Sequence, residues 1–318
     1  MIEAVSMMER VTPNVFTATR LRGCNPSFVT TSDGVVVVDT PQLPTRAVAM
    51  RAEAESHGPI RYLINTEHHV DHIFGNYWFK GAGTVVNHLG LYERFMVVYP
   101  ELDPFAYAYE SVPGENAKGT DLDDPAALAL WPDRDAYYRD PNKGTIVFTG
   151  DLTLHVGDHT FNCLHTPGHT PGQLAVHVPE ERVVFTGDTI FSGCQTWLMT
   201  SDVDQWLAAL ERIRTLDVDW ICPGHGPVVP KSYVDVQRAQ LLRWKAAVAD
   251  AIALGWTREE TVARVDFRDE FGPVDIGQGY MLDYIQSRNA AALYDKLSGG
   301  SPRLTAPDGS PAGTPQAR

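Results

Sequence analysis

Cysteine is scarce in this 318-residue chain, and no two cysteines form a C-x-x-C pair. Scattered thiols argue against both a disulfide framework and a thiolate zinc site. We therefore expect small, buried, apolar side chains at these positions. The four residues are Cys24, Cys163, Cys194 and Cys222. Any metal ion would then need nitrogen and oxygen ligands.

Long apolar runs and basic clusters are missing as well. No stretch approaches the roughly 20 apolar residues of a membrane span, and the first residues, MIEAVSMMERV, lack the apolar core of a secretory signal. The formal net charge is −14 and there is no Lys/Arg run, which disfavours nucleic acid and anionic membranes as partners. We expect a cytoplasmic protein that acts on a small molecule.

The apolar fraction, 43%, is large enough for a sizeable core, and strand patterns alternate with helical ones. SFVTTSDGVVVVDT predicts two strands joined by a Ser-Asp-Gly turn, and the next helix should stop at Gly58. IRYLINT predicts a strand over 60–65. Later helices are predicted for DVDQWLAALERIRTL, for 232–254, from a capping box at Thr257, and for about 280–297. Two mostly β halves, each closed by helices, predict two sheets packed face to face.

Two segments break this pattern. Residues 89–142 are rich in Tyr, Pro, Asp and Gly without a clear period, which is typical of a functional insertion or a lid. Residues 299–318 contain too few apolar side chains to fold, so we expect a disordered tail. The prediction is one domain over 1–298, in which 232–298 form C-terminal helices.

Metal-capable side chains crowd the stretch NTEHHVDHIFGN. In an extended chain, residues i and i+2 point the same way, so Glu67 and His69 can aim at one point. Asp71 can join them if the extended path continues, or it can aim with His72 at a second point where a helix begins. One loop can thus address two ions. The Gly-Asn pair at 75–76 is expected to allow the tight turn that follows.

Three further candidate ligands lie far along the chain, at predicted strand ends or in loops. His169 lies in TPGHTPG, where two Pro-Gly pairs restrict the loop and preorganise the side chain. Asp188 follows an apolar strand in RVVFTGD, and its two oxygens could bridge two ions. His225 lies in CPGHG. Imidazoles and carboxylates suit Zn²⁺, Mn²⁺ or Fe²⁺.

Together these motifs resemble the signature of the metallo-β-lactamase superfamily, H-x-H-x-D-H followed by a distant His, a bridging Asp and a final His. The resemblance runs from about Val11 to Val229. It implies an α+β fold, a four-layer αββα sandwich, with a catalytic domain over 1–298, and a hydrolase that binds one or two Zn²⁺ ions. By the same resemblance, the first ion is bound by Glu67, His69 and His169, and the second by Asp71, His72, Asp188 and His225.

Glu67 departs from the family pattern, since it replaces the first histidine of the signature. Three outcomes are open. Glu67 binds the ion directly; it accepts a hydrogen bond from His68 or from a ligand; or the first site is weak and one ion suffices. We favour direct binding, because the carboxylate keeps the required direction. Its extra charge would lower the Lewis acidity of that ion and make Mn²⁺ or Fe²⁺ more competitive.

These residues predict a metal-dependent hydrolase in which a metal-bound hydroxide attacks an apolar or aromatic small molecule. Asp71 is assigned as the catalytic residue that orients this nucleophile and could carry its proton. Esters, lactones, thioesters, β-lactams and activated aromatic C–X bonds are all open as substrates. The alternatives are an iron-dependent oxidoreductase on the same scaffold and a metal-free binding relative. The aromatic insertion could also pack against a second copy, as in a homo-oligomer.

Substrate contact is assigned to His68 in the metal loop, to the aromatic insertion and to the segment after Asp188, which we expect to line one mouth. The residues so assigned are His68, Tyr99, Phe105, Tyr107, Trp131, Phe191 and Trp197. Asp33 is expected to be a turn residue. Asp39 is expected to end a strand and brace the metal loop.

Overall fold

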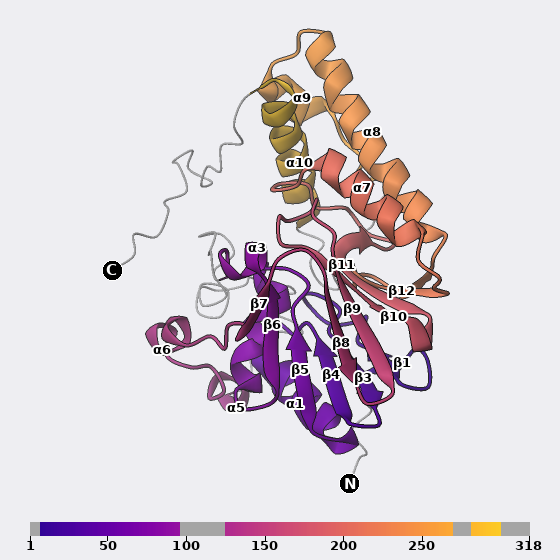
Figure 1. Cartoon of the computed structure of the whole chain (residues 1–318). Helices are drawn as coiled ribbons and strands as arrows, with labels where there is room; N and C mark the ends of the chain where they lie inside the picture. The colour runs from indigo at the N-terminus through magenta and orange to yellow at the C-terminus, as the bar shows by residue number, and fades with distance from the viewer. Residues whose placement is uncertain (1–6, 96–124, 270–280, 300–318) are drawn as a thin grey trace.

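Two sheets lie face to face in the computed structural model, with helices on their outer sides (Figure 1). The structure describes residues 7–95, 125–269 and 281–299. Several predicted features lie outside these ranges: Tyr99, Phe105 and Tyr107 in the insertion, and residues 300–318 of the tail. The mixed α+β sandwich predicted above is confirmed.

The first sheet contains seven strands in chain order. They are β1 (Glu9–Arg10), β2 (Val15–Thr17), β3 (Ser27–Thr31), β4 (Gly34–Val38), β5 (Ile60–Ile64), β6 (Thr84–His88) and β7 (Ile146–Phe148). Strands β1 to β4 pair antiparallel, whereas β4 to β7 pair parallel. Every residue of β4 is buried, which explains its unbroken run of valines. Because the parallel strands end at one edge, the segment that follows β5 emerges at that edge.

The second sheet contains six strands in the order β13-β12-β11-β10-β9-β8. They are β8 (Leu152–Val156), β9 (His159–His165), β10 (Leu174–Val178), β11 (Val183–Phe191), β12 (Trp220–His225) and β13 (Val229–Pro230). Only β11 and β12 pair parallel within this sheet, so their carboxyl ends also share an edge.

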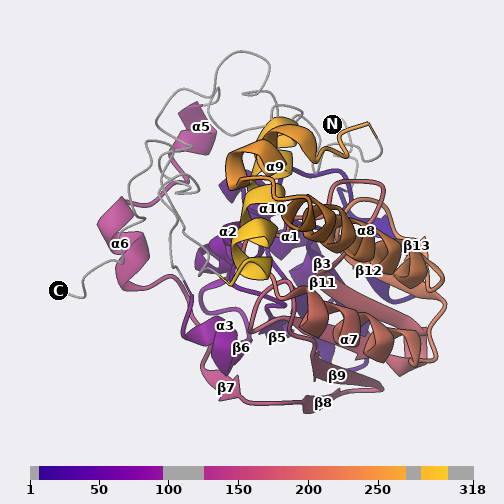
Figure 2. The ribbon, with the colours of Figure 1, turned by 90° about the horizontal axis from the view of Figure 1, so that it is seen from above.

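Helices cover both outer faces. Helix α1 (Pro44–His57) packs on the first sheet, and α7 (Val203–Arg214) and α8 (Tyr233–Ala253) pack on the second, with α9 (Arg258–Arg264) and α10 (Met281–Leu297) beside α8 (Figures 1 and 2). The short helices are α2 (Val70–Ile73), η1 (Phe74–Phe79), α3 (Leu89–Tyr92), α5 (Pro125–Leu128), α6 (Arg134–Arg139) and η5 (Pro179–Glu181). Among the described residues, no helix combines the length and apolarity needed to span a membrane.

Three apolar layers separate the four layers of secondary structure. The middle one, between the sheets, contains Val36, Ile64, Val176 and Phe185. The layer under α1 includes Met50 and Phe79. The layer between the second sheet and the later helices is the largest and contains Trp206, Trp244 and Leu241. Burial of side chains this large contributes roughly 1.5–3 kcal/mol each.

Most local predictions agree with the structure. Asp202 caps α7 by accepting from the backbone N–H of Asp204 and of Gln205, each at 3.1 Å. The Thr257–Glu260 capping box of α9 is present, and all four cysteines are buried without forming a disulfide bond. The described part of 89–142, which has no clear period in the sequence, forms the short helices α3, α5 and α6. Asp133 begins α6 by accepting from the N–H of Ala136 at 3.0 Å.

A polar cluster joins the two sheets at the end of η5. Glu181 accepts hydrogen bonds from Thr12 Oγ1 and, at 2.7 Å, from Asn14 Nδ2, both beside β2 in the first sheet. His159 Nε2 in the second sheet lies 3.0 Å from the same carboxylate. Burial alone would raise the pKa of Glu181, but Thr12, Asn14 and His159 lower it. Burial alone would lower the pKa of His159, but Glu181 and Asp158 raise it.

We predict that Glu181→Gln lowers the free energy of unfolding by about 1–3 kcal/mol, because it leaves partners of a buried acceptor poorly satisfied. A carboxyl group whose pKa is lowered by folding stabilises the folded state above its unfolded pKa, and this stabilisation is lost as pH falls. A histidine whose pKa is raised by folding stabilises the folded state below about pH 6.5, and this stabilisation is lost as pH rises. The difference from wild type should therefore be largest at about pH 5 to 6.5. Urea unfolding at several pH values measures it. Glu180→Gln is the control, since Glu180 accepts only from Thr160 within its own sheet among the bonds described. An equal loss in both variants would contradict the assignment.

Candidate metal centre

The loop that follows β5 is held by buried polar side chains. Thr66 donates to Asp39 through its backbone N–H at 2.7 Å and its hydroxyl at 2.6 Å. Asn65 Nδ2 donates to the carbonyl of His72 at 3.2 Å and to Asn76 Oδ1 at 3.0 Å. Asp39 thus braces the metal loop, as the sequence predicted, and its backbone has a positive φ of 58°. These bonds fix the loop before any ligand side chain is considered.

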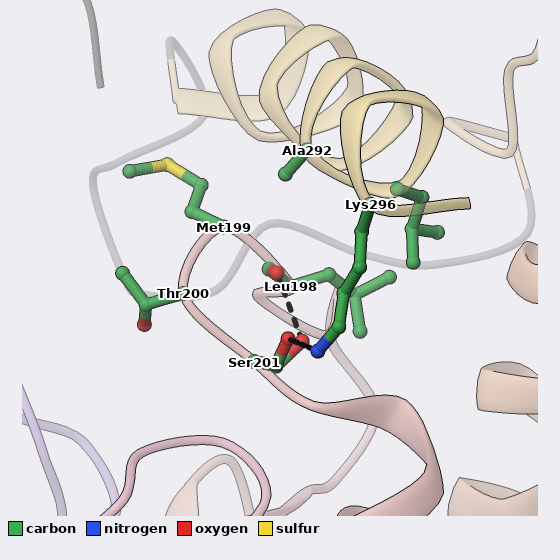
Figure 3. Close-up of a pocket in the computed structure, with 7 residues that line it drawn as sticks. Leu198, Met199, Thr200, Ser201, Ala292 and Lys296 are labelled. Atoms are coloured by element: carbon green, nitrogen blue, oxygen red, sulfur yellow. Dashed lines mark hydrogen bonds between the residues drawn. The ribbon is translucent and has the colours of Figure 1, made fainter. Parts of the chain in front are cut away.

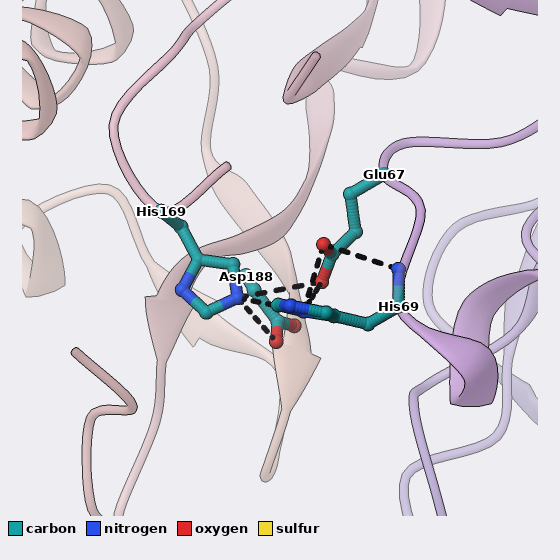
Figure 4. A group of neighbouring side chains, drawn as sticks. All are labelled: Glu67, His69, His169 and Asp188. Atoms are coloured by element: carbon teal, nitrogen blue, oxygen red, sulfur yellow. Dashed lines mark hydrogen bonds and ion pairs between the residues drawn. The ribbon is translucent and has the colours of Figure 1, made fainter. Parts of the chain in front are cut away.

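Four side chains converge on a first point at this edge (Figure 4). Glu67 approaches His69 Nδ1 to 2.9 Å and His169 Nε2 to 3.5 Å. The two facing ring nitrogens of His69 and His169 are 3.1 Å apart. Asp188 Oδ2 lies 3.3 Å from His169 Nε2. Glu67 and His69 come from the loop after β5, His169 from the β9–β10 connection, and Asp188 from β11.

A second group lies against the first. Asp71 Oδ2 is 3.3 Å from His225 Nε2, and His72 Nε2 is 3.1 Å from Asp188 Oδ1. That same oxygen of Asp188 lies 3.4 Å from His225 Nε2. Asp188 therefore directs one oxygen toward each group. All seven residues singled out in the sequence lie in this one cluster.

The cluster fits a divalent cation. His72 Nε2 and Asp188 Oδ1 are buried and make no hydrogen bond, although they face each other. Buried polar atoms are rarely left in that state, because each costs about 1–3 kcal/mol. Imidazole nitrogens and carboxylate oxygens are the donors that Zn²⁺, Mn²⁺ and Fe²⁺ accept. An ion between such atoms would satisfy them together.

Two of the histidines are oriented from behind. His72 Nδ1 lies 2.8 Å from Asp39 Oδ2, and His169 Nδ1 lies 3.0 Å from the carbonyl oxygen of Trp197. A carboxylate and a carbonyl can only accept, so each Nδ1 carries the proton. Each Nε2 is then left with its lone pair toward the cluster, the arrangement in which histidine binds metal.

The carboxyl groups of the cluster are ionised at neutral pH. Burial alone would raise the pKa of Glu67, but His69, His169 and His72 hold it well below its ordinary value. The pKa values of Asp71 and Asp188 are lowered in the same way by His72 and His225. The three carboxyl groups can therefore offer ionised oxygens to a cation.

Close backbone approaches correct two of the sequence predictions. Asp188 lies inside β11, not after it, beside a register shift at Gly187 with φ 47°. A Cβ on the neighbouring Gly224 would lie 1.9 Å from Asp188 Oδ1, so only glycine leaves room for this carboxylate. Glycine is needed at position 75 because the backbone there passes close to Pro41: a Cβ would lie 2.3 Å from the carbonyl oxygen of Pro41. Gly75 lies in η1 without a positive φ, so it is not the turn residue expected.

The described residues assigned to substrate contact lie in different surroundings. His68 is buried, with its ring 4.9 Å from that of His69. Phe191 is fully buried and stacks on His225 at 5.3 Å, so it supports a ligand instead of lining a mouth. Trp131 packs against Phe74. Trp197 contributes its carbonyl oxygen to His169, which no sequence signal indicates because every residue has a carbonyl.

Comparisons with known proteins match both the sequence and the fold of this chain. A family model described as the metallo-beta-lactamase superfamily matches residues 19–225. An acyl-coenzyme A thioesterase of Gallus gallus is 31% identical over 81 residues, which are 24% of this chain and 29% of that protein. A hydroxyacylglutathione hydrolase of Bartonella quintana is 42% identical over 67 residues, 21% of this chain and 26% of that one. The chain thus spans less than a third of these curated relatives.

A solved structure of a metallo-beta-lactamase family protein from Thermus thermophilus matches with a TM-score of 0.58 and 16% identity. The match covers 92% of this chain and 98% of that one. At this identity the likeness concerns the fold alone.

We predict that Asp39→Asn weakens metal binding at the group around His72 by about 10–100-fold, because an amide has one acceptor oxygen and cannot accept from both the Thr66 N–H and His72 Nδ1. Competition with a chelating dye measures the affinity. Asp33→Asn is the matched control, since Asp33 pairs with Arg61 in an exposed turn. Equal affinities in both variants would show that Asp39 does not orient the ligand.

Proposed function

This chain belongs to the metallo-β-lactamase superfamily, and from that premise we propose that it is a metal-dependent hydrolase of acyl thioesters. The observation that carries the proposal is the position of Asp188, whose two oxygens face two adjacent ligand groups at 3.1 and 3.3 Å. The thioester is proposed because one relative is named a thioesterase and another a hydrolase of an acylated thiol, glutathione.

We propose that Glu67, His69 and His169 bind one ion, that Asp71, His72 and His225 bind a second, and that Asp188 contributes to both. Glu67 is fully buried and directed at the two histidines of its group, which supports direct ligation over an outer role. Zn²⁺ is the ion proposed, with Mn²⁺ or Fe²⁺ as competitors at the Glu67 group. When bound, such ions act as Lewis acids and lower the pKa of a bound water to about 7.

Asp71 is the proposed catalytic residue. Its side chain is 19% exposed, compared with 5% for Asp188 and 0% for Glu67, so it is the cluster carboxylate that a substrate and its water can best reach. Its Oδ2 lies 3.3 Å from His225 Nε2, within the same group of proposed ligands. We assign this oxygen to orient the attacking water and to accept its proton, which can then pass to the departing thiolate.

A cavity of about 300 Å³ between residues 198–201 and helix α10 supports an apolar acyl group (Figure 3). Leu198, Met199, Ala292 and Leu293 supply its apolar lining. The cavity wall contacts the loop that carries His169, because Thr200 Oγ1 donates to the carbonyl of His169 at 3.4 Å. The volume is near the lower end of the roughly 300–1,000 Å³ of small-molecule sites.

Lys296, which also lines this cavity, is not evidence for an anionic substrate. Its ammonium donates to the carbonyl of Ser201 at 3.1 Å and lies 3.0 Å from Asp202 Oδ2, so its charge is balanced within the protein.

Turnover of thioesters tests the function. We expect hydrolysis of acyl-coenzyme A or acyl-glutathione, faster with hexanoyl or octanoyl than with acetyl, that stops on chelation and returns with added Zn²⁺. His225→Ala should abolish turnover and lower metal content, whereas His155→Ala on the exposed part of β8 should change neither. Release of thiol, followed with a chromogenic thiol reagent, gives the rate. Undiminished activity in chelated, metal-free protein would refute the proposal.

Glu67→His tests the unusual ligand. Zn²⁺ prefers imidazole nitrogen over carboxylate oxygen more strongly than Mn²⁺ does, so the variant should bind Zn²⁺ more strongly relative to Mn²⁺ than the wild type. Glu67→Gln keeps the shape but removes the charge, and it should weaken Mn²⁺ binding most. Metal affinities measured in parallel by dye competition decide this. If the Zn²⁺/Mn²⁺ affinity ratio is the same in all three proteins, Glu67 is not a ligand.

A further inference from the structure

We infer that Asn289, on helix α10, is a positioning residue for the ligand His169. Asn289 acts on His169 through the backbone of Trp197, which lies between them. The inference concerns how the metal centre is held, and it does not depend on which substrate the protein takes.

Asn289 holds the chain on both sides of Trp197. Its Nδ2 donates to the carbonyl of Thr196 at 2.8 Å, and its Oδ1 accepts from the backbone N–H of Leu198 at 2.7 Å. Asn289 is fully buried, so water does not compete for either bond. Two bonds from one planar amide fix both the position and the rotation of the short segment between them.

The fixed segment aims a carbonyl at His169. The Trp197 oxygen lies 3.0 Å from His169 Nδ1, and on the opposite side of the ring His169 Nε2 faces Glu67 and Asp188 at 3.5 and 3.3 Å. If the peptide of Trp197 rotated, the ring would lose the acceptor that keeps Nε2 directed inward.

The backbone of His169 is secured separately. Asp202 donates its N–H to the carbonyl of Gly168 at 2.6 Å, and Thr200 Oγ1 donates to the carbonyl of His169. The role left for Asn289 is therefore to fix the direction of the ring's acceptor. Helix α10 therefore helps to hold the metal centre, although it lies far along the chain from every ligand (Figures 1 and 2).

Helix α8 holds the same segment from its other end. Gln237 Nε2 donates to Thr196 Oγ1 at 2.8 Å, and Gln237 Oε1 accepts from the N–H of Phe191 at 2.9 Å. Thr196 Oγ1 in turn donates to Gln240 Oε1 at 2.9 Å. These bonds stop at Thr196, whereas Asn289 bonds the residues on both sides of Trp197.

The chain offers a matched control on the same helix. Gln286 is also a buried amide of α10, and its Oε1 accepts from the N–H of Phe267 at 2.8 Å, away from the ligand loop. Asn289→Leu and Gln286→Leu thus both replace a buried amide of α10 by leucine, but only the first removes the bonds that flank Trp197.

The experiment compares the two variants with wild type in two measurements. The first is titration with Co²⁺, followed by its absorption bands. Asn289→Leu should lower the Co²⁺ affinity of the His169 group by about tenfold or more and leave the affinity of the group around His225 unchanged. Gln286→Leu should leave both affinities unchanged.

The second measurement uses metal-free protein labelled with ¹⁵N-histidine. The slowly exchanging Nδ1–H signal of His169 should be present in wild type and Gln286→Leu and lost in Asn289→Leu. If Asn289→Leu fails to fold by circular dichroism, Asn289→Asp replaces it, because it keeps the acceptor for Leu198 and loses the donor to Thr196.

The inference is overturned if the Asn289 variant that folds keeps the wild-type Co²⁺ affinity and the His169 signal, or if Gln286→Leu loses both to the same extent. The proposed function fails differently: wild-type protein would bind no ion while its His169 Nδ1–H signal still depended on Asn289.

Discussion

Three largely buried carboxylates meet at one edge of the sandwich, and the contacts at this edge compensate for the free-energy cost of burying them. Glu67, Asp71 and Asp188 would each lose several kcal/mol of hydration if left alone. Four imidazoles surround them at about hydrogen-bonding distance and keep them ionised. The atoms left without hydrogen bonds face one another, which is the arrangement that a bound cation completes.

The fold supplies this edge through its strand directions. In the first sheet β5 ends beside its parallel neighbours, and in the second β11 and β12 run parallel, so loops of both sheets open on the same side. Glycine then allows the close approach that the cluster needs, as where Gly224 passes Asp188. Buried amides and Asp39 hold the loops, so the ligands are positioned before an ion arrives.

Glu67 gives this centre its individual character. An ion in this group of two histidines and two carboxylates would face more negative charge than imidazole ligands alone would provide. That charge would stabilise the cation while reducing its pull on a substrate oxygen. The second group has Asp71, His72 and His225 of its own, so with the shared Asp188 both halves of the cluster offer two imidazoles and two carboxylates.

Local chemistry was sufficient for much of this protein. The valines of β4, the capping box at Thr257 and the end of α1 before Gly58 are short-range patterns, and the seven candidate ligands stand out because their residue types and spacing are readable along the chain. Tertiary structure alone decided the rest. Phe191 stacks on His225, and the backbone of Gly75 lies too close to the carbonyl of Pro41 to leave room for a Cβ. Asn289 bonds the chain on both sides of Trp197, whose carbonyl faces His169. These contacts join distant segments through rings, backbone atoms and close approaches, which the identity of neighbouring residues does not encode.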